Sequence, residues 1–365
     1  MKFSAFFVVA TGIQSGLGAV LKPRDDPPDG NVQVLEPKNF KDLGSKRVKI
    51  RYGPMVVPGI DDESTHGMQS FDGMNAAMPC QDCLIMAALS NLEFEDGTTA
   101  NANTSMSLHH TVLFNLNRTD ATCETFPERF MAAGNERTPL DLTLGGTRKA
   151  GYYVKGDDQV FMMTELMNEA QEAQTVYLTA EWEFIEGVPE GFDLAVPLWL
   201  DVTGTCSSSE VAIDPEDKIF NFTMSPEWSP KFTGDLFTMV GHLHDGGLKQ
   251  EVYMDGKKIC ESVAHYGESE GFMEPMGPMD PMASMERISS ITGCDNFGSI
   301  GPDNKFSITA FYDLTQHPGM KDHQGGLQPV MGIELLHVGR PKDEAMKDIL
   351  SSKQPDLQDI LGSLP

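Results

Sequence analysis

Four of the nine histidines stand in two closely spaced pairs, and imidazole is the side chain that proteins use most often to bind a metal. His109 and His110 are adjacent in "TSMSLHHTVLFN", a run that is typical of a β-strand. His242 and His244 are two residues apart in "TMVGHLHDGG". Side chains two apart on a strand share a face, so these imidazoles can chelate one ion before the chain turns away. The alternative is a pair of surface histidines beside a turn.

The adjacent pair, His109 and His110, can bind one ion only if the strand departs from regular geometry. Successive side chains of a strand point to opposite faces of the sheet, so His109 and His110 should face apart. Both can reach one ion only if the strand ends or bulges there, because a bulge redirects a side chain. The polar approach "ANANTSMS" favours a strand that begins here. Alternatively, one histidine is buried and hydrogen-bonded while the other lies in solvent.

Strand-like runs dominate the part of the chain that must position these histidines. They are short and separated by Gly, Asp, Asn and Pro, which predicts a mostly β fold built from antiparallel sandwiches or barrels. Asp255-Gly256 suits a tight hairpin turn. Helical periodicity is confined to residues 164–173 and 343–352. The predicted strand segments are 47–57, 109–116, 159–166, 175–184, 194–203, 236–244, 250–259, 305–314 and 331–339.

Composition shifts divide the chain into a lead-in, two domains and a tail. Residues 20–45 are rich in Pro, Asp and Lys and predict an extended lead-in. The polar stretch at 201–218 marks the boundary between a first sandwich at 46–204 and a second at 205–340, followed by an acidic tail at 341–365. The chain of 365 residues, 40% hydrophobic, is long enough for two such cores. Its net charge of −27 disfavours nucleic acid and anionic membranes as partners.

The first residues and the sequons predict a secreted glycoprotein. Residues 1–19 carry a single lysine, Lys2, near their start, continue with a short apolar stretch and end in small residues, the order of a secretory signal peptide. That stretch is too short to cross a bilayer, and no later segment is apolar for long enough to do so. Asn103, Asn117 and Asn221 each stand in a glycosylation sequon.

Six cysteines also suit an oxidising compartment, where disulfides persist. Cys80 and Cys83 in "PCQDC" could form a metal or redox pair, but no second pair of this spacing accompanies them. We therefore predict disulfides to distant partners. We expect one of these two cysteines to pair with Cys123, and Cys260 to pair with Cys294.

The order of the histidine motifs resembles that of the copper type II, ascorbate-dependent monooxygenases, the family of peptidylglycine hydroxylating monooxygenase and dopamine β-hydroxylase. The match comprises His109-His110, His242-x-His244 and Met331, which opens a strand in "VMGIELLHVG". It runs from about residue 46 to residue 340, and the chain also looks like secreted fungal relatives of that family. The resemblance implies two antiparallel eight-stranded jelly-roll β-sandwich domains side by side, with one copper on each, facing a solvent-filled cleft.

The same resemblance implies a function. His242, His244 and Met331 would hold the catalytic copper, and two imidazoles with a thioether favour Cu(I) while permitting Cu(II). His109 and His110 would hold the other copper. The expected activity is oxygen activation and hydroxylation of a C–H bond, driven by ascorbate or another external reductant. The alternative is a non-catalytic extracellular copper-binding or surface protein that has lost two-copper turnover.

Two departures from the family pattern bear on this prediction. The first copper should have a third histidine, but the matching position is Leu166, so Met167 beside it is a possible extra ligand. The positions of the carboxylate clamp in the peptide-amidating enzyme hold Val240, Ile333 and Leu335, which cannot pair with a carboxylate. These positions therefore disfavour peptidylglycine as the substrate, and the identity of the substrate, a small molecule or a peptide, is not predicted. The motifs do not predict an oligomeric state either.

A methionine ladder and the remaining histidines complete the candidates. The ladder has a methionine at every third position, and its thioethers either collect Cu(I) or cover an apolar surface and absorb oxidants. Of the other histidines, we predict that His317, His323 and His337 are structural or solvated, with His317 as a possible extra ligand, whereas His66 and His265 stand in no motif. The ladder comprises Met273, Met276, Met279, Met282 and Met285, and the other histidines are His66, His265, His323 and His337.

Overall fold

The computed structural model describes residues 31–352 apart from 207, 215, 276–283 and 322–325. These residues form 22 β-strands and one α-helix, so the prediction of a mostly β fold is confirmed. Short 3₁₀ helices such as η2 (Lys41–Leu43) and η3 (Ala102–Thr104) lie between strands. The predicted signal peptide, His323 and the middle of the methionine ladder lie outside the described residues.

The largest sheet has 11 strands and runs through both halves of the chain. Its strand order is β1-β2-β10-β4-β8-β11-β22-β14-β20, with β12 added to β22 and β7 to β4. The halves are joined where β8 and β11 pair in parallel. The strands are β1 (Val32–Leu35), β2 (Lys46–Val57), β4 (Cys83–Phe94), β7 (Leu140–Asp141), β8 (Ala150–Val154), β10 (Gln174–Glu186), β11 (Asp193–Asp201), β12 (Glu210–Val211), β14 (Gly234–Leu243), β20 (Gly293–Ile300) and β22 (Val330–Pro341).

Three smaller sheets pack around this one. The four-stranded sheet, called the central sheet below, has the order β3 (Met68–Asn75), β9 (Val160–Asn168), β5 (Met106–Thr119) and β6 (Pro127–Gly134). The five-stranded sheet has the order β13 (Ile219–Thr223), β21 (Phe306–Asp313), β15 (Gly247–Met254), β16 (Lys257–Tyr266) and β19 (Ile288–Ile291). A two-stranded ribbon pairs β17 (Met273–Pro275) with β18 (Ser284–Glu286).

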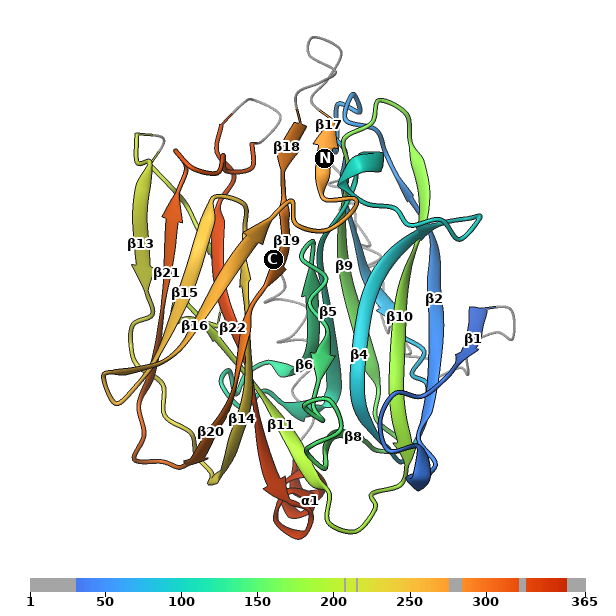
Figure 1. Cartoon of the computed structure of the whole chain (residues 1–365), viewed down its shortest axis with the longest axis vertical. Helices are drawn as coiled ribbons and strands as arrows, with labels where there is room; N and C mark the ends of the chain where they lie inside the picture. Colours follow the sequence, from blue (N-terminus) through green and yellow to red (C-terminus); the bar gives the residue numbers. More distant parts are fainter. Residues whose placement is uncertain (1–30, 207, 215, 276–283, 322–325, 353–365) are drawn as a thin grey trace, which may run out of the picture.

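The central sheet lies between the two halves of the largest sheet (Figure 1). One of its faces packs against β2, β4 and β10 in a core that includes Leu108, Leu166 and Trp182. A second core, with Leu336 and Phe306, lies between β11, β14, β22 and the five-stranded sheet. The other face of the central sheet is therefore turned toward β14 and β22, which brings residues far apart in sequence together.

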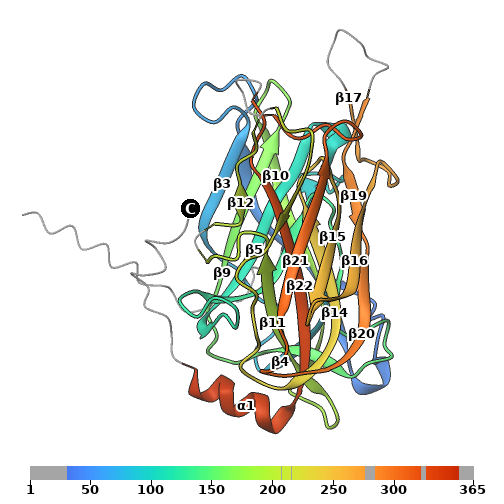
Figure 2. The same cartoon turned by 90° about the vertical axis from the view of Figure 1, so that its left-hand side faces the viewer.

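Local patterns predicted some elements correctly and others not. The hairpin at Asp255-Gly256 is confirmed, and both residues have the positive φ that such a turn requires, 54° and 73°. The predicted tail helix is confirmed as α1 (Lys342–Ser351), which lies at one end of the molecule (Figure 2). The predicted helix at 164–173 is wrong, because 164–168 belong to β9 and alternate in burial as a strand does. The described part of the lead-in contains β1, which pairs with β2.

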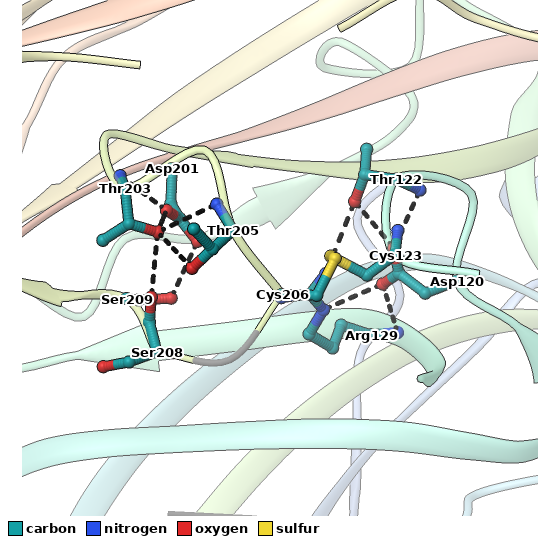
Figure 3. The surroundings of a disulfide bond; sticks show 10 residues. All are labelled: Asp120, Thr122, Cys123, Arg129, Asp201, Thr203, Thr205, Cys206, Ser208 and Ser209. Carbon is teal, nitrogen blue, oxygen red and sulfur yellow. Dashed lines mark hydrogen bonds and ion pairs between the residues drawn. A yellow bond between two sulfur atoms is a disulfide. The ribbon is translucent and has the colours of Figure 1, made fainter. Parts of the chain in front are cut away.

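Three disulfides join the six cysteines. The predicted bond between Cys260 and Cys294 is confirmed. The prediction for the others is wrong. Cys80 and Cys83 bond to each other, because the turn before β4 brings their Cα atoms to 6.1 Å, within disulfide range. Cys123 bonds instead to Cys206, in the connection between β11 and β12 (Figure 3).

The described residues include no helix with both the length and the apolar character that a bilayer crossing requires.

Candidate metal centre

The two histidine pairs meet in one place. His109 and His110 lie on β5, and His242 and His244 lie on β14 and directly after it. The Nε2 atoms of His110 and His244 are 3.1 Å apart, and the rings of His110 and His242 are 5.1 Å apart between centroids. The resemblance implied two sites that face each other across a solvent-filled cleft. The structure instead forms one group of four imidazoles, called the histidine cluster below.

A bulge in β5 makes this arrangement possible. Leu108 pairs with Leu166 on β9, but the next pairing joins His110 to Glu165, so His109 is the extra residue. Of the two possibilities that the sequence left open, a strand end and a bulge, the structure has the bulge, whereas the strand itself begins earlier, at Met106. The bulge turns both rings toward one carboxylate. Oε2 of Glu165 lies 2.6 Å from Nδ1 of His109 and 3.5 Å from Nδ1 of His110.

The other pair is held through the same ring atom. Nδ1 of His242 lies 3.0 Å from Oε1 of Glu136, and Nδ1 of His244 lies 2.8 Å from the carbonyl oxygen of Pro329. An oxygen acceptor at Nδ1 keeps the ring proton there and leaves the Nε2 lone pair for a metal. The buried Nε2 atoms of His109 and His242 have no hydrogen-bond partner among the described residues. The contacts at Nδ1 of His109, His242 and His244 thus favour the tautomer that metal binding requires.

The electrostatics agree with this protonation. Burial, and then the charge of His109, lower the pKa of His110 to about 3. Burial also lowers the pKa of His244 well below its ordinary value. Burial acts to raise the pKa of Glu165, but its hydrogen bonds from the two histidines outweigh this and lower it. Near pH 7 the site therefore presents neutral His110 and His244 rings beside an ionised carboxylate.

The close packing of His242 depends on a glycine. A Cβ atom at Gly134 on β6 would lie 2.5 Å from Cε1 of His242 and 2.6 Å from Oε2 of Glu136, closer than atoms can approach. Any larger residue at position 134 would therefore push His242 away from the central sheet. The sequence analysis did not identify Gly134 or Glu136, because their partner His242 lies more than 100 residues away.

The sequence analysis did not identify Glu165 either, although the family resemblance pointed to its neighbour, Leu166. The matching position for the absent histidine was Leu166, which is fully buried in the first core. The bulge at His109 shifts the register by one residue, so Glu165 on the opposite face of β9 meets the histidines. Met167 lines a separate cavity together with His109. Its role as a ligand stays a prediction.

Met331 lies at the start of β22, beside the end of β14. The hydroxyl of Tyr312 donates to the carbonyl oxygen of Met331 and accepts a hydrogen bond from the backbone N–H of His244 at 3.2 Å. Met331 also lines the same cavity as His110. These contacts join the two segments, and copper binding by Met331 stays a prediction. His317 stacks on the ring of Tyr266, with centroids 3.6 Å apart.

A cavity of about 400 Å³ opens beside the cluster between the central sheet and β11 and β22. We call it the apolar cleft. His110 and Glu165 form one part of its wall, and Asp201, Glu210 and Arg129 lie at its polar margin. Arg129 is paired with Asp120 at 2.8 Å. The apolar wall comprises Val112, Phe114, Phe126, Met163, Trp199, Met331 and Ile333.

Exchange of Glu165 for glutamine should weaken copper binding about 10- to 100-fold, the usual cost of losing a group that orients a metal-binding histidine. The glutamine amide keeps one oxygen that can accept a hydrogen bond. Its NH₂ group is a donor, however, and it can face an Nδ1–H that donated to the carboxylate of Glu165. Competition titration with a copper chelator measures the effect. Glu261→Gln, which removes a carboxylate paired with surface lysines, is the control. Equal affinity of both variants would show that Glu165 does not orient the cluster.

His337 on β22 should make stability depend on pH. Burial lowers its pKa to about 4, so between pH 6.5 and 4 the unfolded chain binds a proton that the folded chain does not. The free energy of unfolding therefore decreases as pH falls through this window, by at most about 1.4 kcal/mol per pH unit. Urea unfolding of metal-free protein at pH 7, 5.5 and 4.5 should show a steeper loss for the wild type than for His337→Leu. Parallel curves would contradict the prediction.

No family model matches the chain. The chain is 37% identical over 292 residues to the probable copper-dependent oxygenase M1 of a Phoma species, covering 80% of this chain and 72% of that protein. It is 38% identical over 251 residues to the probable copper-dependent oxygenase clz3 of Cochliobolus lunatus, covering 68% of this chain and 77% of the relative.

Among solved structures, that of PNGF-II in space group P21 aligns with this chain over 81% of this chain and 66% of the PNGF-II chain. The TM-score is 0.43 and the identity 11%, too low to indicate a shared fold or function.

Proposed function

Because the chain belongs to the family of probable copper-dependent oxygenases, we propose that it is a copper-dependent monooxygenase whose copper binds at the histidine cluster. The observation that carries this proposal is the arrangement of the four rings. Each is held by an oxygen near Nδ1, and the Nε2 atoms are left for a metal. Imidazole nitrogens are ligands that suit copper.

The distances support binding of a single ion. His109, His110 and His244 each offer a ring nitrogen, and these three nitrogens lie within 4.8 Å of one another. Two nitrogens that bind one ion at about 2.0–2.1 Å each lie about 3 Å apart, close to the 3.1 Å between Nε2 of His110 and His244. His242 and Met331 are the proposed further ligands. Bound copper would supply one-electron redox chemistry and a binding position for dioxygen.

The proposed reaction inserts one oxygen atom of O₂ into a C–H bond of the substrate and releases the other as water. This requires two electrons and two protons, which an external two-electron reductant such as ascorbate supplies. Glu165 and Glu136 hold the rings in place throughout, and the apolar walls exclude water from the reacting carbon.

The apolar cleft is the proposed substrate site. Its wall of aromatic and aliphatic side chains favours an apolar molecule. Glu165, Asp201 and Glu210 disfavour an anion, and the charge of Arg129 is already paired with Asp120. We therefore propose an uncharged, largely apolar substrate.

We also propose that the protein is secreted. Residues 1–19 have the order of a signal peptide, and three disulfides favour an oxidising compartment. Two of the three sequon asparagines, Asn103 and Asn221, are exposed and could carry a glycan.

Copper-dependent oxygen uptake tests the proposal. Purified protein is loaded with copper, the bound metal is counted, and ascorbate-driven oxygen consumption is measured for the wild type and His242→Ala. His265→Ala is the matched control, because its ring is paired with Glu268 outside the cluster. We expect the wild type and the control to consume oxygen faster than His242→Ala. A wild-type rate no higher than that of His242→Ala would favour the non-catalytic copper-binding alternative.

A further inference from the structure

A second, much smaller cavity lies against the histidine cluster. Its volume is about 30 Å³, which is enough for one small molecule. The rings of His110 and His242 form part of its wall. Most of the rest comes from β5 and β6 on one side and from β14 and β22 on the other, with aliphatic side chains that include Val112, Ala132, Val240, Ile333 and Leu335.

The surface of this small cavity is almost entirely apolar. Thr111, Glu136, Thr138 and Trp199 also line it. Oγ1 of Thr138 and Nε1 of Trp199 are enclosed by protein and expose almost no area. Oγ1 of Thr111 is hydrogen-bonded to Oγ1 of Thr164, and Oε1 of Glu136 is engaged by the backbone N–H of Gly134 and by Nδ1 of His242. A buried water needs two to four polar partners, whereas an apolar cavity stays dry and takes up apolar gases. The wall therefore favours an apolar diatomic molecule over water.

The small cavity lies between two larger ones. It shares His110, Trp199 and Ile333 with the apolar cleft. It shares Thr138, Val240 and Leu335 with a separate hollow of about 390 Å³, which is also lined by Pro139, Pro197 and Leu144. The small cavity thus adjoins both the cleft and the hollow through shared wall residues.

We propose that the small cavity holds dioxygen beside His110 and His242, and that the hollow is its route of entry. The inference rests on the proposed function, because it assigns a place to one of the two substrates of that reaction. Val240, Ile333 and Leu335 acquire a role here. At the positions where the amidating enzyme clamps a carboxylate, this chain has aliphatic side chains that line the small cavity.

Filling the cavity tests this assignment. Ala132→Val and Val240→Leu add methyl groups to its wall on two different strands. Ala264→Val, on β16 and outside every cavity described here, is the matched control. Crystals of the metal-free protein under xenon pressure should show one xenon in the small cavity of the wild type and of Ala264→Val. The two filled variants should show none.

Oxygen kinetics provide the second measurement. In copper-loaded protein, the KM for O₂ in ascorbate-driven uptake should rise about tenfold in a filled variant, a loss of about 1.4 kcal/mol of oxygen binding, with the copper content unchanged. No xenon in the wild type, or an unchanged KM in a variant that has lost xenon, would overturn the assignment. Xenon binding without any oxygen uptake by the wild type would overturn the proposed function itself, and the oxygen role with it.

Discussion

Replacing His110 by alanine should lower the affinity for copper by more than about a hundredfold, a larger loss than that expected from removing an orienting carboxylate. His110 is the centre of the cluster. Its ring lies 4.0 Å from that of His109, 5.1 Å from that of His242 and 5.2 Å from that of His244, measured between centroids. Its loss removes a proposed nitrogen ligand and the contact between β5 and the segment at the end of β14.

Chelator competition measures this affinity, and metal analysis gives the number of ions bound. His265→Ala should keep the affinity of the wild type, since it removes an imidazole without touching the cluster. Near-ultraviolet circular dichroism of the metal-free proteins shows whether both variants are folded. The single cluster predicts one copper for each chain. A folded His110→Ala variant with the affinity of the wild type would place the copper elsewhere.

Removal of the Cys123–Cys206 disulfide should lower the free energy of unfolding by about 4 kcal/mol. The bond joins residues 83 apart, and in the chain-entropy model a closed loop of this length restricts the unfolded state by about 4–5 kcal/mol. It also links the segment that follows β5 to the connection between β11 and β12, near the polar margin of the apolar cleft (Figure 3). Urea unfolding of the Cys123→Ala, Cys206→Ala double variant measures the loss.

The Cys80–Cys83 bond provides the comparison. Its cysteines are only three residues apart, so Cys80→Ala, Cys83→Ala should cost about 2 kcal/mol by the same reasoning. Both double variants should still bind copper, because none of the four cysteines belongs to the histidine cluster. Equal losses in the two variants would mean that loop length does not determine what these bonds contribute.

The strand elements were largely predictable because their information is local. Alternating residues in segments such as 175–184 and 331–339 identify strands wherever these are placed in the fold, and Asp255-Gly256 identifies its own turn. The segment 164–173 shows the limit of this reasoning. Its residues fit a helical pattern, but its first half pairs with β3 and β5 on either side, and that pairing outweighs local preference.

The disulfides show the same division. Cys260 and Cys294 were correctly paired, whereas the partner of Cys123 was not identified. Cys206 lies in the other half of the chain, and its approach to Cys123 depends on how the central sheet packs against β11. Sequence spacing contains no information about that packing.

The sequence by itself determined the candidate ligands and the condition that an adjacent histidine pair needs a strand end or a bulge, because residue type and strand alternation are local properties. Only the tertiary structure decided that both pairs form one cluster, and that Glu165 and Glu136 hold its rings. Those contacts join strands more than 50 residues apart. They depend on the register between sheets, which is set by the packing of two separate cores.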